Sequence, residues 1–137
     1  MSRARHMTAY ALVLGLSLSA PSAAAAQAGA GAWQSTPASI LKSSLRNVVA
    51  AQDKYRASHP VFAGTIEALQ LDPGADMRIQ ILGATPNSWR AKATHRARPG
   101  RSCVIFVGPL VGAGLPKTDG DGETAGEERV PLCDRME

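Results

Sequence analysis

Two oppositely charged clusters hold most of the residues whose chemistry suggests a ligand. The acidic cluster alternates carboxylates with glycines and begins with Asp119, Asp121 and Glu123. Carboxylate oxygens at this spacing suit Ca²⁺, which takes roughly six to eight oxygen ligands. The EF-hand pattern is not present, because its glycine and its final glutamate are replaced by Thr124 and Val130. We expect a solvated acidic loop. The alternative is a weak calcium site, and no other cofactor is predicted.

The basic cluster precedes the acidic one. Its five cationic residues are Arg90, Lys92, Arg96, Arg98 and Arg101. Together they could bind an anionic ligand, and the neighbouring Trp89 could stack on a nucleic-acid base. However, charges at alternate positions of a strand are also what an antiparallel sheet with one wet face carries. We favour the second explanation, so the anionic-ligand patch stays an alternative and nucleic acid is not a favoured partner.

The histidines do not indicate catalysis. His59 and His95 are not part of a pair with zinc-ligand spacing. No serine lies in a nucleophile elbow or a comparable frame. We therefore expect a protein that is not an enzyme.

The N-terminal residues 1–28 have the layout of a secretory signal peptide. Arg3, Arg5 and His6 form a basic start, residues 11–18 are an apolar core, and small residues lead to a cleavage point after Ala28. The apolar core is shorter than the roughly 20 residues that span a bilayer. We expect an exported chain, periplasmic or extracellular, with no membrane span after cleavage.

Two cysteines, Cys103 and Cys133, lie in the part of the chain that remains after cleavage. In a small exported protein, two cysteines predict one disulfide. Such a bridge closes a loop of about thirty residues and stabilises the fold by about 3–4 kcal/mol on the chain-entropy model. The formal net charge of the whole chain is +4. Two of these charges, Arg3 and Arg5, belong to the signal peptide. The remaining charges are unevenly distributed, and the basic and acidic clusters could attract each other across the disulfide loop.

The residues after the signal predict one helix followed by strands. Residues 29–36 are expected to be a flexible leader, and Thr36 followed by Pro37 is a good helix start. Apolar residues then recur at helical spacing until Pro60, so a helix is predicted over 37–58. A short second helix is expected at 65–71. The pattern then becomes that of strands, at 77–81, 89–95, 103–107 and 128–133.

The predicted architecture is α+β, with one long N-terminal helix packed on an antiparallel sheet of about four strands. The short connections favour an antiparallel meander. Cys103 and Cys133 would join the last strand to the third and close a C-terminal disulfide loop. Pro131 places the last strand at an edge of the sheet.

These residues resemble the headpiece of type IV pilin-like and pseudopilin-like proteins. The helix and the connection after it carry the similarity through Leu45, Arg46, Asn47, Ala51, Gln52, Asp53, Tyr55, Phe62 and Leu69. The strand "WRAKATH", the cysteine-containing strand that ends in "VG", and the final cysteine continue it. The resemblance covers about residues 39–134, and it is the order of these segments that gives it specificity.

The chain departs from pilins at its N-terminus. The short pilin leader and the long apolar helix that anchors a pilin in the membrane are replaced here by a conventional signal peptide. The resemblance implies a domain at 37–137 that acts through protein contacts in the cell envelope or pilus. Its expected role is as an accessory to a type IV pilus or a type II secretion system. The alternative is a periplasmic or extracellular module that binds an anionic ligand or calcium.

Overall fold

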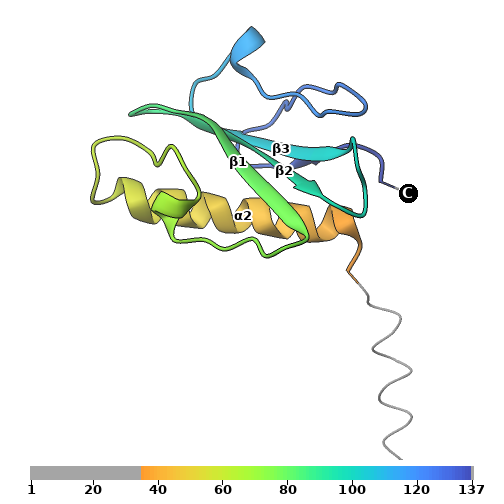
Figure 1. The fold of residues 1–137 in the computed structure, drawn as a ribbon. Helices are drawn as coiled ribbons and strands as arrows, with labels where there is room; N and C mark the ends of the chain where they lie inside the picture. Colours follow the sequence, from red (N-terminus) through yellow and green to blue (C-terminus); the bar gives the residue numbers. More distant parts are fainter. Residues whose placement is uncertain (1–34, 137) are drawn as a thin grey trace, which may run out of the picture. The chain divides into compact units, whose positions relative to one another are not determined.

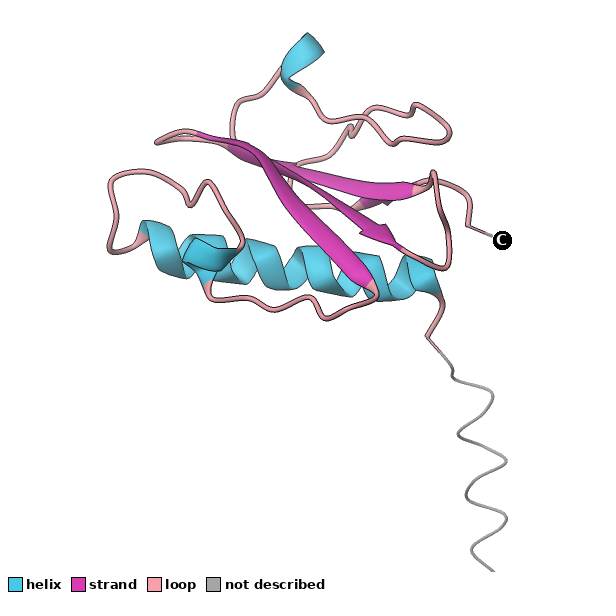
Figure 2. Ribbon diagram, in the orientation of Figure 1, coloured by secondary structure: helices cyan, strands magenta, loops and turns pink. Residues whose placement is uncertain are grey.

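The computed structural model describes residues 35–136, in which one long helix packs on a four-stranded antiparallel sheet (Figures 1 and 2). The expected signal peptide and most of the expected leader lie outside these residues. The elements are α2 (Pro37–Arg56), a 3₁₀ helix (Glu67–Leu69), β1 (Met77–Ala84), β2 (Trp89–His95), β3 (Ser102–Val107), a 3₁₀ turn (Gly112–Gly114) and β4 (Leu132–Cys133). The strand order β1-β2-β3-β4 is a meander, so the predicted fold class is confirmed.

Helix α2 begins where the sequence predicts. The Thr36 hydroxyl accepts a hydrogen bond from the backbone N–H of Ser39 at 3.2 Å, and Pro37 occupies the first turn. The helix ends at Arg56, two residues before the predicted end. Ala57 still donates to the Asp53 carbonyl in the helical pattern, and Ser58 then donates to the Tyr55 carbonyl in a tighter turn.

The buried side of α2 carries Leu41, Leu45, Val48 and Gln52, at spacings of three and four residues. The amide of Gln52 pairs with both backbone groups of Ala63, at 2.8 Å for each hydrogen bond. A buried amide must be satisfied in this way, because an unpaired one costs about 1–3 kcal/mol. Gln52 therefore fixes the connection between the helix and the sheet.

The sheet presents its small residues to the helix. Ala91 and Ala93 of β2 are fully buried in the same core as the apolar side of α2, while Arg90 and Lys92 project from the opposite face. The short alanine side chains let the helix approach the centre of the sheet. The expected alternation of small and charged residues on this strand is confirmed.

Strand β3 is covered on both faces. All six of its residues are buried, which agrees with its continuous apolar sequence. Val104 and Phe106 face away from α2 and pack with Ala125, Leu110 and Leu115 of the C-terminal chain. The segment between β3 and β4 therefore forms a second cover on the sheet. No helix within residues 35–136 is long and apolar enough to cross a membrane.

Candidate functional site

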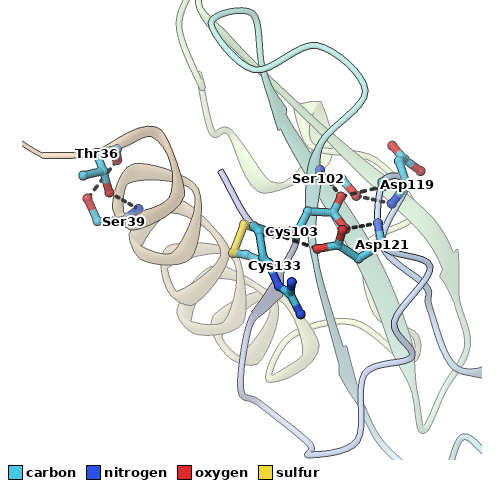
Figure 3. The surroundings of a disulfide bond; sticks show 10 residues. Thr36, Ser39, Ser102, Cys103, Asp119, Asp121 and Cys133 are labelled. Carbon is cyan, nitrogen blue, oxygen red and sulfur yellow. Dashed lines mark hydrogen bonds between the residues drawn. A yellow bond between two sulfur atoms is a disulfide. The ribbon is translucent and has the colours of Figure 1, made fainter. Parts of the chain in front are cut away.

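The predicted disulfide joins Cys103 of β3 to Cys133 of β4 (Figure 3). The two residues are direct partners in the antiparallel pairing of these strands. Strand β4 has only two residues, and it lies at the edge of the sheet, as Pro131 predicts. Because so short a strand contributes few ladder hydrogen bonds, the disulfide is the main covalent restraint on the end of the chain.

Asp134, which the sequence analysis did not single out, holds the C-terminal chain together next to this disulfide. Its carboxylate accepts hydrogen bonds from the backbone N–H groups of Ser102 (2.8 Å), Gly120 (2.8 Å) and Asp121 (2.7 Å). The Ser102 hydroxyl in turn accepts from the backbone N–H of Asp119 (Figure 3). One buried carboxylate therefore connects β3, the acidic loop and the residue after β4.

The ionisation of Asp134 follows from this arrangement. Only 3% of the residue is exposed, and burial alone would raise the pKa of its carboxyl. Hydrogen bonds from the Thr118 side chain and from three backbone N–H groups outweigh burial and lower the pKa to about 2. The carboxyl of Asp121 also has a lowered pKa, through hydrogen bonds from the Arg135 backbone and the Arg101 guanidinium. Both groups are structural anions at neutral pH.

The structure brings much of the basic cluster onto acidic partners. Lys92 forms an ion pair with Asp119, and Arg101 pairs with Asp121 at 2.6 Å. Both pairs join the sheet to the acidic loop, so the two clusters do attract each other across the disulfide loop, although exposed pairs of this kind contribute little individually. Arg96 pairs with Asp76 at 2.7 Å near the start of β1.

The other two basic residues donate to backbone carbonyls. Arg98 Nε donates to the carbonyl of Met136 at 2.9 Å, and Arg90 donates from one terminal nitrogen to the carbonyl of Gly114 at 2.9 Å. Within residues 35–136 neither has a carboxylate partner. The five residues therefore form separate contacts, and Lys92, Arg96 and Arg101 have charges that are already balanced.

Two of the three candidate calcium ligands already have cationic partners, and the third is held through its backbone. The carboxylates of Asp119 and Asp121 bind cationic side chains, and Glu123 forms backbone hydrogen bonds with Thr118. In the part of the chain that the structure describes, no three His, Cys, Asp or Glu residues form a group that could hold a metal. Calcium binding by this loop stays a prediction, which titration of the protein with Ca²⁺ would test.

The two histidines have local structural contacts. The His59 ring stacks on Tyr55 with centroids 3.7 Å apart, and its Nδ1 lies 2.8 Å from the Tyr55 carbonyl at the end of α2. Nδ1 of His95 accepts a hydrogen bond from the backbone N–H of Ala97 at 3.1 Å. Nδ1 of His59 also lies 3.1 Å from the hydroxyl oxygen of Ser58, the residue before it.

The most exposed apolar element is the uncharged stretch 108–116, here called the apolar loop, which has the sequence "GPLVGAGLP". Val111 is 81% exposed, far more than any other large hydrophobic residue described. Both ends of the loop are fixed: the Gly108 N–H donates to Glu128 at 2.9 Å, and Leu110 and Leu115 pack against β3. The lack of charged residues in this stretch is the sequence signal that could have indicated this loop.

The apolar loop and the β1–β2 turn enclose a surface hollow of about 500 Å³. Its walls include Gly83, Trp89, Arg90, Leu110 and Ala113. Gly108 lies against the turn with φ of +98°, and a side chain there would collide with the backbone of Asn87 and Ser88. This close approach sets the position of the loop beside the turn.

Comparison with known proteins does not assign the chain to a family. No family model matches the chain, and no curated protein is significantly similar to it.

Proposed function

We propose that this chain is an exported, non-catalytic, pilin-like domain that acts by protein contact as an accessory to a type IV pilus or a type II secretion system. The observation that carries the proposal is the apolar loop, whose ends are fixed by the hydrogen bond from Gly108 to Glu128 and by the packing of Leu110 and Leu115 on β3, and from which Val111 projects. Exposed apolar surface with a rigid support is typical of protein interaction sites.

The contacts of the charged residues favour this function over ligand binding. Lys92, Arg101, Asp119 and Asp121 are used to hold the C-terminal chain on the sheet, and an added anion or calcium ion would have to displace those contacts. The apolar loop carries no such internal contact at Val111. A partner protein would bury Val111 without breaking an ion pair.

The pilin resemblance supports the choice of partner. It implies a helix that supports a sheet and a C-terminal disulfide loop, and the described domain has both. Most exposed side chains of α2 are polar, because Leu41, Leu45 and Val48 are buried against the sheet. We therefore expect the domain to contact its partner through the apolar loop, on the face of the sheet that is turned away from α2.

Photo-crosslinking in cells that export the protein tests this function. A photoreactive phenylalanine analogue replaces Val111, and a second strain carries it at Val61, which is 41% exposed elsewhere on the domain. We expect irradiation to join the Val111 variant to pilus or secretion components, with a much lower yield from position 61. No adduct at position 111, or equal yields at both positions, would refute contact through this loop.

A further inference from the structure

The hollow beside the apolar loop has one feature that the contacts of the loop do not use. The side chain of Arg90 extends from β2 over Gly83 of β1, which has no side chain. Arg90 Nε lies 3.5 Å from the position that a Cβ on Gly83 would occupy. From there the side chain reaches the Gly114 carbonyl at the far side of the hollow. A guanidinium therefore forms part of the wall of an otherwise mostly apolar depression.

This guanidinium has free binding capacity. Arginine carries five N–H donors, and within residues 35–136 the side chain of Arg90 donates one hydrogen bond, to Gly114. Lys92, the next outward residue of the same strand, is balanced by Asp119, whereas Arg90 has no carboxylate partner within residues 35–136. A half-buried guanidinium in an apolar setting favours a carboxylate, which it can bind with two parallel hydrogen bonds.

The walls of the hollow define the rest of the ligand. Leu110 and Ala113 offer apolar surface, whereas Trp89 is only 1% exposed and packs in the core under α2. The β1–β2 turn is held by hydrogen bonds between Thr85 and Ser88 through backbone and side chain. The hydroxyls of this turn bond to each other at 2.8 Å and so are partly occupied. The hollow therefore suits a ligand with an apolar side chain next to one carboxylate better than it suits a fully polar anion.

We propose that the hollow binds a segment of a partner protein in which an aspartate or glutamate lies beside apolar residues, with the carboxylate on Arg90. This inference rests on the proposed function and names the chemistry of the partner. Charge complementarity selects the acidic residue, and the apolar loop selects its neighbours. Arginine is one of the residue types that most often dominate binding energy at protein interfaces.

The test is an NMR titration of the domain with two short probes, acetyl-Leu-Asp-Leu-amide and its counterpart with asparagine. We expect the aspartate probe to shift the backbone amide signals of Gly83 and Ala113. The asparagine probe should bind about tenfold more weakly, because it lacks the charge that Arg90 recognises.

Three variants separate the explanations. R90Q should abolish the difference between the probes, and R90K should retain part of it. R78Q removes an exposed arginine from the same face of β1 and should leave binding unchanged. Equal binding of the two probes, or an aspartate preference that survives R90Q, would overturn the proposal. If position 111 crosslinks to envelope proteins but neither probe binds, this inference alone is rejected. If the aspartate probe binds through Arg90 but position 111 forms no crosslink, the proposed envelope function is rejected.

Discussion

Replacing Asp134 with asparagine tests the claim that one carboxylate organises the C-terminal chain. In the native domain its Oδ2 accepts from the backbone N–H groups of Ser102 and Gly120, and its Oδ1 accepts from Asp121. Asparagine has one oxygen and one NH₂ group. The oxygen can replace Oδ2, but the NH₂ group would then face the N–H of Asp121, and two donors cannot bond.

The expected cost of D134N is about 2–3 kcal/mol. The partly buried N–H of Asp121 loses its acceptor, which costs about 1 kcal/mol, and two hydrogen bonds lose the assistance of a full charge, at roughly half a kcal/mol to one kcal/mol each. The lowered pKa gives a second measure of the same stabilisation. A fall from 3.8 to about 2 corresponds to about 2 kcal/mol of folding free energy at neutral pH.

Urea unfolding, followed by the fluorescence of the buried Trp89, provides the assay, with the disulfide kept oxidised. The folded-state pKa of Asp134 lies below its unfolded-state value, so its stabilisation is complete above about pH 4 and is lost as the pH falls through about 2. The stability difference between wild type and D134N should therefore narrow by about 2 kcal/mol between pH 7 and pH 2.

D76N is the matched control for D134N, because Asp76 forms an exposed ion pair with Arg96. It should change the stability at pH 7 by less than about 1 kcal/mol. The argument for Asp134 would be refuted by a D134N variant as stable as D76N, or by a difference that stays constant across the pH range.

Three further changes test other parts of the fold. Q52L leaves two buried backbone groups unpaired and should cost about 2–5 kcal/mol in urea unfolding, whereas Q80L, on the exposed face of β1, should cost less than about 0.5 kcal/mol. Equal effects would contradict the role given to Gln52. Replacing Cys103 and Cys133 together with alanine should lower the unfolding free energy by at least about 3 kcal/mol, the chain-entropy contribution of the bridge. An unchanged melting temperature of the double variant would contradict this contribution of the disulfide. T36A should cost about 1 kcal/mol through loss of the helix cap, and T36S, which keeps the hydroxyl, should restore most of it.

The fold was predictable because local patterns and global packing agree. The cap and proline at the start of α2, the alternation in "WRAKATH" and the apolar run of β3 each specify one element. The meander then follows from short connections. The limits of β4 were less predictable: residues 128–133 were expected as a strand, but only Leu132 and Cys133 pair with β3. Arg129, with φ of +68°, leaves the extended conformation before the pairing begins.

The central residue of the site could not be predicted from the sequence, for a physical reason. Asp134 lies among charged residues near the chain end, and nothing in its type or spacing distinguishes it from a solvated carboxylate. Its role depends on three N–H donors from Ser102, Gly120 and Asp121, which only the folded chain brings to one point. A pairing between the charged clusters was foreseeable in outline, but which residue meets which depends on the register of β2 against the loop.

Because the basic and acidic clusters pair with each other, the basic cluster in this sequence does not by itself indicate an anion-binding site. A basic cluster indicates a ligand only if its charges remain uncompensated after folding, and Lys92, Arg96 and Arg101 do not meet that condition. Arg90 meets it, because its strand position directs it over Gly83 toward the apolar loop and away from the acidic loop. The same register that pairs Lys92 with Asp119 leaves Arg90 without a carboxylate partner among residues 35–136. For this reason one guanidinium in an apolar hollow, rather than the whole cluster, is where a partner's acidic residue should bind.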